Sequence, residues 1–409
     1  MKQFYIKHLL ALLLLLCSTM ANAYDFISDG IYYTRISETE VSVTYGTTPY
    51  SGKLIIPESV TNSSETGVSY TVTAIGEQAF ANSTGLTSIT IPKTITIVNN
   101  GSFNGCTGLT EVVIEDSTEP LYLGYHSWGT APRSGYGLFY DCPLESVHQG
   151  RTVTYYESYQ GGYSPFAYKS TIKSFTYGKD VTAINYCALY RCDGIETLTI
   201  PDKVERIAQE AFSGCSGLKG ELIIPNSVES IGIWAFKDCS NLTGIILSNS
   251  ITRIEESTFD GCLSLESLVI PEGVTFIGGF AFNHCESLKS MRIASSVTQI
   301  ANCAFDYCTS LKHLYFADSE ETLTLGSGHN GSHFTRGAFD FSPLESIYLG
   351  RNITHPTNAE PFYNKSQITE LTIGESVTGL PYRCFTNCAG ITTITIPSSI
   401  TEIGEDAFY

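Results

Sequence analysis

Residues 270–293 read IPEGVTFIGGFAFNHCESLKSMRI, a pattern that returns along most of the chain. Shifting the sequence by 23 residues brings isoleucine-proline onto isoleucine-proline and alanine-phenylalanine onto alanine-phenylalanine. The phenylalanine recurs in successive units with steps of 24, 23, 23 and 23 residues, at Phe212, Phe236, Phe259, Phe282 and Phe305. The same register reappears from Phe80 to Phe103 and from Phe385 to Phe408. Self-similarity at a fixed period predicts a repeat architecture.

Each unit opens with a short apolar strand pattern. In LESLVI, residues 265–270, Leu268 and Ile270 are two positions apart, so both side chains point to one face of a strand. Pro271 then ends the strand, because proline has no amide to donate to a neighbouring strand. A second apolar piece, Val274 to Ile277, precedes Ala-Phe-x-x-Cys-x-x-Leu, whose spacing of three predicts one helical or 3₁₀ turn.

A single unit is too small to bury its own apolar side chains, whereas stacked units share one continuous core. Equivalent strands would then lie parallel and about 4.8 Å apart, and about fourteen coils would form a rod or arc of roughly 65 Å. Each buried phenylalanine or isoleucine contributes about 1.5–3 kcal/mol. The array as a whole therefore has an ample core.

The letters I-P-x-S-V-x-x-I-G-x-x-A-F-x-x-C-x-x-L, shown by IPNSVESIGIWAFKDCSNL at residues 224–242, resemble the BspA-like bacterial surface leucine-rich repeats. The resemblance covers roughly residues 51 to 409. It implies a right-handed leucine-rich repeat solenoid of the α/β horseshoe class, rich in β-structure. Parallel strands are expected on the concave face, with short strands and 3₁₀ or helical turns on the convex side. The family is associated with adhesion and with binding host proteins.

The first 23 residues have the features of a secretory signal peptide. Lys2 and Lys7 precede an apolar run at residues 9–16, and Ala21-Asn22-Ala23 supplies a cleavage signal. The alternative, a lipoprotein cysteine at Cys17, is less favoured because a bulky leucine precedes it. No other segment has the roughly 18 apolar residues that a transmembrane helix needs. The sequence therefore predicts a secreted or bacterial cell-surface protein without a transmembrane segment.

The chain is acidic, with 23 Lys and Arg against 41 Asp and Glu and a formal charge of −18. Removing residues 1–23 takes away Lys2 and Lys7, which leaves 21 basic residues and a charge of −20. An acidic surface repels phosphate backbones and anionic lipid. Nucleic acid is therefore excluded as an expected partner.

Residues 24–50 are predicted to form a β-hairpin that caps the array, which then occupies residues 51–409. Two stretches interrupt the period, at about residues 115–142 and 317–342, and they resemble each other as if a multi-repeat block had been duplicated. Each insertion is expected to open with a hairpin, as in Leu314 to Phe316 followed by Leu323 to Leu325. The last unit stops at Tyr409, so we expect either a chain truncated at the C-terminus, which is favoured, or an edge covered by something else.

Nine cysteines lie three residues after the phenylalanine position, at Cys106, Cys142, Cys192, Cys215, Cys239, Cys262, Cys285, Cys308 and Cys388. Stacked cysteines point in parallel, whereas a disulfide needs opposed Cβ atoms about 3.8 Å apart. Ser83 and Ser342 share this position, so we expect it to select a small side chain and the cysteines to be buried free thiols. The remaining Cys187, Cys303 and Cys384 leave local pairing or zinc binding as a less favoured alternative.

Other chemical signatures are weak. His329 and His333 are four residues apart, but the glycines between and around them indicate a loop, where a helical metal spacing has no meaning. The sequence has no G-x-S-x-G elbow, H-E-x-x-H motif or phosphate-binding glycine loop. We therefore expect a non-enzymatic protein with no metal and no cofactor.

Candidate binding residues come from the strand position between the two inward side chains, which points outward. Arg292, Tyr315 and Tyr348 occupy this position in consecutive units, and His313 projects beside Tyr315. Arginine and tyrosine are enriched at binding hot spots. A second candidate set is the aromatic insertion residues Tyr122, Tyr125, Trp128, Tyr155, Tyr156 and Tyr159. The alternative for that set is packing of the insertions onto the solenoid.

These features predict a surface protein that binds an extracellular or host protein in adhesion. The alternative is a glycan-binding surface protein, since exposed aromatic rings serve both kinds of ligand.

Overall fold

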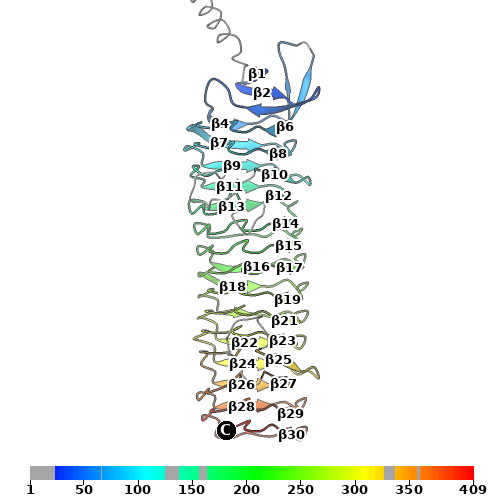
Figure 1. Cartoon of the computed structure of the whole chain (residues 1–409), viewed down its shortest axis with the longest axis vertical. Coiled ribbons are helices and arrows are strands. Elements are labelled where there is room, and N and C mark those ends of the chain that lie inside the picture. The colour runs from blue at the N-terminus through cyan, green and yellow to red at the C-terminus, as the bar shows by residue number, and fades with distance from the viewer. Residues whose placement is uncertain (1–23, 66, 125–137, 156–163, 327–336, 357–359) are drawn as a thin grey trace, which may run out of the picture.

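The computed structural model describes residues 24–65, 67–124, 138–155, 164–326, 337–356 and 360–409. The chain winds into coils that stack in one long column, with the N-terminal strands at one end and residue 409 at the other (Figure 1). Strands of successive coils lie parallel and side by side. The predicted β-rich leucine-rich repeat solenoid is therefore confirmed.

The longer strands form the first of two strand columns (Figure 1). They are β4 (Ser51–Ile55), β7 (Gly85–Ile91), β9 (Glu111–Ile114), β11 (Ser146–Gln149), β13 (Ser174–Tyr177), β16 (Gly220–Ile223), β18 (Leu242–Ile246), β20 (Ser267–Leu268), β22 (Ser290–Ile293), β24 (His313–Phe316), β26 (Ser346–Leu349) and β28 (Glu370–Ile373). The hydrogen-bonded ladder is continuous from β22 to β28 and separate from the sheet β16-β18-β20. The exposed side of this column is called the sheet face below.

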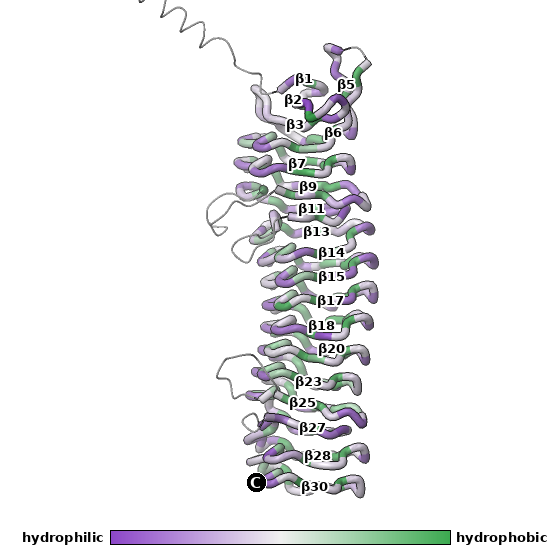
Figure 2. The backbone as a smooth tube through the Cα atoms, turned by 45° about the vertical axis from the view of Figure 1, so that its right-hand side comes forward, coloured by the Kyte–Doolittle hydropathy of each residue, from purple (hydrophilic) through white to green (hydrophobic). Residues whose placement is uncertain are grey.

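The second column consists mostly of strands of two or three residues, with the seven-residue β6 near its start. They are β6 (Ser69–Ile75), β8 (Ile97–Val98), β10 (Leu121–Leu123), β12 (Val153–Thr154), β14 (Ala183–Ile184), β15 (Arg206–Ile207), β17 (Ser230–Ile231), β19 (Arg253–Ile254), β21 (Phe276–Ile277), β23 (Gln299–Ile300), β25 (Leu323–Leu325), β27 (Ile353–Thr354), β29 (Gly379–Leu380) and β30 (Glu402–Ile403). In most of these two-residue strands one side chain is buried and the next is partly or fully exposed. Apolar side chains from both columns form one buried core. Figure 2 colours the hydrophobic residues of the coils green along the column.

The N-terminal strands β1 (Phe26–Ser28), β2 (Ile31–Arg35) and β3 (Glu40–Thr44) form an antiparallel meander. Strand β3 then pairs in parallel with β6, so the meander continues the second column. The short β5 (Ser59–Thr61) folds back antiparallel on β6. Side chains of β2 and β3 join the same core as the repeats, because Tyr33 and Val41 are fully buried.

Stacked phenylalanines run through the core. Phe259 is fully buried and its ring lies 5.7 Å from that of Phe236 and 5.5 Å from that of Phe282, nearly parallel to both. Equivalent stacks join Phe80 to Phe103 and Phe385 to Phe408. Each ring thus supplies one wall of the next coil's core, as the shared-core interpretation predicts.

The turn around each phenylalanine is not helical. Phe280 and His284 flank Phe282 and have φ of 57° and 55°, in the left-handed region. The amides of Phe282 and His284 donate to carbonyl oxygens of the next coil at 2.8 and 2.9 Å, while the amide of Cys285 donates to the Phe282 carbonyl at 3.2 Å. A left-handed residue on each side stops helix propagation. The expected short turns are therefore present as isolated turns closed by a hydrogen bond between residues three apart, as from Phe282 to Cys285, and the described residues contain no helix.

The prediction that each insertion opens with a hairpin is wrong. Strand β24 pairs with β22 and β26 in the first column, whereas β25 pairs with β23 and β27 in the second. Strands β9 and β10 are divided between the columns in the same way. Both segments are therefore ordinary coil strands, and the extra residues come after β10 and β25.

The cysteine position selects a hydrogen-bond donor and tolerates a large side chain. The twelve cysteines from Cys106 to Cys388 form no disulfide within the described residues and are buried, as expected. Cys262 donates its thiol to the carbonyl of Phe236 in the preceding coil at 3.3 Å, and Ser342 donates to Phe305 at 2.7 Å. Lys365 occupies the same position and donates to Phe339 at 2.8 Å. The expectation of a small side chain is therefore wrong.

This arrangement predicts how Cys262 responds to substitution. We expect Cys262→Val to cost about 0.5–1.5 kcal/mol, because valine removes one of the two donors of the buried Phe236 carbonyl, which retains the Cys239 amide at 3.2 Å. Cys262→Ser retains a donor and is expected to cost less. Urea unfolding of both variants tests this. Equal losses would show that the thiol acts only as a packing group.

Candidate functional site

The sheet face carries one outward side chain per coil, midway between two inward ones. We call this set the outward ladder. It comprises Thr90, Val113, His148, Thr176, Thr199, Ile223, Ile246, Val269, Arg292, Tyr315, Tyr348, Thr372 and Thr395, with Ile55 preceding it in register on β4. None of these residues is buried. The predicted outward orientation is therefore confirmed.

The strands bring the first set of candidate residues together. Arg292 on β22, Tyr315 on β24 and Tyr348 on β26 are direct register partners, as are His313 and Ser346. The Tyr315 and Tyr348 rings stack with centroids 4.5 Å apart and an interplanar angle of 8°. The Arg292 guanidinium carbon lies 5.5 Å from the centroid of the Tyr315 ring. We call Arg292, His313, Tyr315 and Tyr348 the aromatic cluster.

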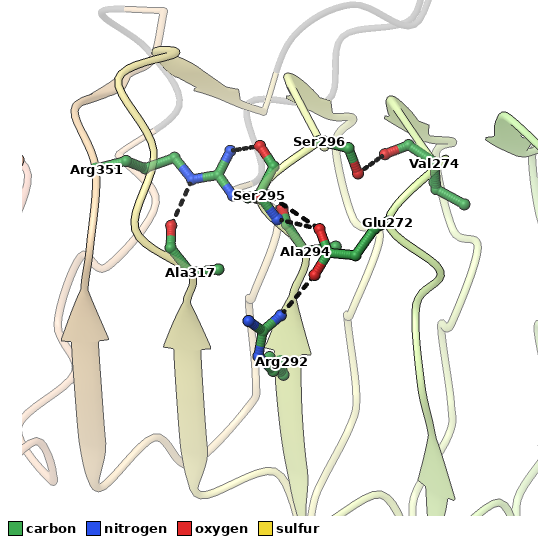
Figure 3. A network of polar contacts seen from close by, with 8 residues as sticks. All are labelled: Glu272, Val274, Arg292, Ala294, Ser295, Ser296, Ala317 and Arg351. Carbon is green, nitrogen blue, oxygen red and sulfur yellow. Dashed lines mark hydrogen bonds and ion pairs between the residues drawn. The ribbon is translucent and has the colours of Figure 1, made fainter.

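Acidic side chains hold the ends of the cluster. Arg292 Nη1 lies 3.2 Å from Glu272 Oε1, while Glu272 Oε2 accepts hydrogen bonds from the amide and hydroxyl of Ser295 (Figure 3). Partial burial raises the pKa of Glu272, but the Ser295 hydrogen bonds and the Arg292 charge together outweigh it, and the net shift is downward. Glu272 is therefore ionised at neutral pH and holds Arg292 in place.

At the other end, Tyr348 donates its hydroxyl proton to Asp318 Oδ1 at 2.7 Å. This hydrogen bond, with a smaller contribution from burial, raises the pKa of Tyr348 to about 12. His313 Nδ1 lies 2.8 Å from Ser346 Oγ, on the next strand. Arg292, His313 and Tyr348 thus each have a polar partner that fixes their orientation, while Tyr315 is 38% exposed.

A fully buried arginine supports the cluster from behind. Arg351 donates from Nε to the Ala317 carbonyl at 3.1 Å and from Nη1 to the carbonyls of Ser295 and Val297 at 3.0 and 2.7 Å. Its Nη2 also donates to Ala294. Burial lowers the pKa of Arg351, but four carbonyl oxygens solvate the cation. Because Ser295 also binds Glu272, Arg351 fixes the loop that positions Arg292 (Figure 3).

A second exposed group on the sheet face was not singled out from the sequence. Ile223, Ile246 and Val269 are consecutive members of the outward ladder and are 60%, 47% and 79% exposed. We call them the apolar triplet. They line a hollow of about 470 Å³ together with prolines and asparagines that follow the strands. Because β-branched residues are typical of strands, their presence in the sequence did not indicate that three adjacent apolar side chains are exposed to solvent.

The second candidate set is only partly described. Tyr155 is buried and its hydroxyl donates to the Tyr186 carbonyl at 2.7 Å, so it is a packing residue and not a binding residue. Tyr122 lies on β10 and is 37% exposed. Tyr125, Trp128, Tyr156 and Tyr159 lie outside the described residues. For Tyr155, the alternative of packing onto the solenoid is the correct interpretation.

The described residues show no group of three or more His, Cys, Asp or Glu side chains that could hold a metal ion. His284 stacks on Tyr307 with ring centroids 4.6 Å apart and is partly exposed. Burial raises the pKa of the Cys106 thiol to about 11, so little thiolate forms at neutral pH. His329 and His333 lie outside the described residues. Within the described ranges no helix is long and apolar enough to cross a membrane.

Comparison with protein-family models matches the BspA type leucine rich repeat region over residues 58–125, 131–219, 219–327 and 323–409. The chain belongs to the BspA-type leucine-rich repeat family. The resemblance seen in the sequence is thereby confirmed. Repeat proteins of this class are generally scaffolds that present an extended surface to other proteins. No curated protein sequence matches this BspA-type chain.

Three of the solved structures with a similar chain are as follows. One from Bacteroides ovatus is 21% identical, with 94% of this chain and 92% of that chain covered and a TM-score of 0.44. A leucine rich cell surface protein from Faecalibacterium prausnitzii is 25% identical, with 72% and 95% covered and a TM-score of 0.31. The pneumococcal vaccine antigen PcpA is 19% identical, with 83% and 95% covered and a TM-score of 0.33.

Proposed function

We propose that this protein is secreted or displayed on a bacterial cell surface and binds an extracellular or host protein in adhesion, through its sheet face. The observation that carries the proposal is the aromatic cluster: two stacked tyrosines and an arginine, exposed on three hydrogen-bonded strands. Rigid strands and fixed polar partners reduce the conformational entropy lost on binding. Tyrosine and arginine are also the residues most often found at protein hot spots.

The ring arrangement favours a protein ligand over a glycan. A sugar that stacks on tyrosine needs a free ring face, but Tyr315 has Tyr348 against one face and the Arg292 guanidinium nearby. The guanidinium N–H groups that do not face Glu272 remain as donors for a partner's carbonyl and carboxylate groups, and the Tyr348 hydroxyl, whose proton goes to Asp318, remains as an acceptor. The proposed role in adhesion comes from membership of the BspA-type family. The proposed location of the contact comes from the aromatic cluster.

The test uses residues 24–409 on arrays of extracellular matrix proteins and of glycans. We expect binding to one or more proteins, and at least a 30-fold loss, about 2 kcal/mol, when Arg292, His313, Tyr315 and Tyr348 are replaced together by serine. The control replaces Thr176, Thr199 and Thr395 of the same ladder by serine and should bind normally. Unchanged affinity of the fourfold variant, or binding to glycans alone, would contradict the proposal.

A further inference from the structure

The apolar triplet differs from the rest of the outward ladder. Thr176 and Thr199 precede it in the ladder, and Thr372 and Thr395 close the ladder, so a polar β-branched side chain satisfies the strand at this position. Ile223, Ile246 and Val269 instead leave three neighbouring apolar side chains in solvent. Contiguous exposed apolar groups of this kind mark interaction sites.

The hollow forms at the middle of the three coils, that of β18, because this coil has small residues where its neighbours have larger ones. Gly244 lies in register with Glu221 and Ser267, so its strand has no outward side chain at that position. Ser248 stands where both neighbouring coils have proline, and it is buried with its hydroxyl donated to the Val228 carbonyl at 2.6 Å. The resulting volume of about 470 Å³ is within the roughly 300–1,000 Å³ typical of ligand pockets. It holds more than one partner side chain.

The backbone chemistry of the sheet favours a helix as the occupant. The amides and carbonyls of β16 and β18 are already paired with each other and face along the sheet. An extended peptide laid on the apolar side chains would therefore lose water from its peptide groups without gaining partners, which is costly. An α-helix satisfies its own backbone hydrogen bonds and presents only side chains.

The spacing of the ladder also matches a helix. Neighbouring coils repeat at about 4.8 Å, the separation of adjacent strands. Residues that alternate three and four apart along a helix repeat on average every 3.5 residues, or about 5.3 Å at a rise of 1.5 Å. A helix lying along the solenoid axis can thus place one apolar side chain between each pair of rungs over the whole triplet.

Charge defines the partner further. Glu266 and Glu272, next to the hollow, are paired with Lys289 and Arg292 at 3.0 and 3.2 Å. Glu221 lines the hollow, its side chain lies over Gly244, and it makes no ion pair within the part of the chain that the structure describes. A cation from the partner would complete this site, in a protein whose overall charge is −18.

We infer that the apolar triplet and its hollow dock an amphipathic α-helix of a partner protein, with aliphatic side chains three and four residues apart and a lysine or arginine beside Glu221. The inference rests on the proposed protein-binding function and names the kind of segment that is bound. It places a second contact on the same face as the aromatic cluster, beginning one coil away, since Val269 and Arg292 are consecutive members of the ladder.

The probe is a synthetic amphipathic helix of about 18 residues, roughly 27 Å long, with leucines three and four apart among alanines and lysines. Its binding to residues 24–409 is measured by fluorescence anisotropy. Two peptides of equal length serve as comparisons: one with glutamate in place of lysine, and one with leucine and lysine alternating to favour a strand. We expect the lysine helix to bind at least tenfold more tightly than either.

The decisive variant combines Ile223→Thr, Ile246→Thr and Val269→Thr, which introduces the residue that other rungs carry. We expect at least a tenfold loss of affinity for the lysine helix. Ile55→Thr, equally exposed on the same ladder at β4, is the matched control and should have no effect. Glu221→Gln should weaken the lysine helix several-fold and should not weaken the glutamate helix, because the substitution removes a like charge from beside it.

Unchanged affinity in the triple threonine variant, or tighter binding of the alternating peptide, would overturn the inference. The proposed function is tested separately, because it depends on the aromatic cluster and on whole matrix proteins. A chain that binds a matrix protein but not the helix would retain the proposed function and lose the inference.

Discussion

Phe259→Ala is expected to lower the free energy of unfolding by about 3–5 kcal/mol. The ring is fully buried and stacked between Phe236 and Phe282 at 5.7 and 5.5 Å. Alanine would remove the contacts on both ring faces and leave a cavity that the flanking coils cannot fill, since their backbones are fixed by inter-coil hydrogen bonds. Guanidinium unfolding followed by circular dichroism measures the loss.

Phe259→Leu is the control, because it retains much of the volume and should cost less than half as much. The double variant with Phe282→Ala should depart from additivity, because the two rings touch. A loss below about 1 kcal/mol for Phe259→Ala would contradict the shared core.

Arg351→Met is expected to cost more than about 3 kcal/mol, because the carbonyl oxygens of Ser295, Val297 and Ala317 lose the donor that Arg351 supplies, at about 1–3 kcal/mol each, partly relieved by relaxation. The fourth carbonyl, that of Ala294, retains the Val297 amide at 3.2 Å. Arg151 provides a matched comparison. It lies 200 positions earlier, is equally buried, and donates to the carbonyls of Pro92 and Lys93 at 2.9 Å, while its Nε has no hydrogen-bond partner among the described residues. Arg151→Met should therefore cost less.

The same pair of variants separates stability from recognition. Arg351 holds Ser295, which holds Glu272 and through it Arg292. We therefore expect Arg351→Met to weaken binding at the aromatic cluster even where the chain remains folded, and Arg151→Met to leave it unchanged. Equal stability losses in the two variants would show that the additional carbonyl contacts of Arg351 contribute nothing.

Periodicity explains why so much of this structure could be predicted. Once Leu268 and Ile270 are placed inward, every equivalent residue follows by counting, and so does the adjacency of Arg292, Tyr315 and Tyr348. The register of a parallel sheet built from equal units is fixed by the unit length. The aromatic cluster could therefore be located without any structure, although its ligand could not.

The errors came from positions where spacing does not report backbone conformation. Spacing of three around Phe282 predicted the short turn that is found, but bulky Phe280 and His284 give no warning that each has a left-handed φ. The donor role of the cysteine position was visible in principle, because Lys169 and Lys365 also lie three residues after a phenylalanine. The buried Tyr155 could not be told from an exposed one, because its coil departs from the repeat.

The outward ladder places side chains at a regular spacing along the solenoid. Any two ladder residues that a ligand contacts are separated by a whole number of coil spacings. The outward side chain of each coil can be replaced by a single substitution without changing the buried core. Deleting one 23-residue unit between two groups of ligand-contacting residues would shorten their separation by one coil spacing and leave both groups unchanged. Selectivity for ligand length can thus change by gain or loss of units, independently of selectivity for ligand chemistry.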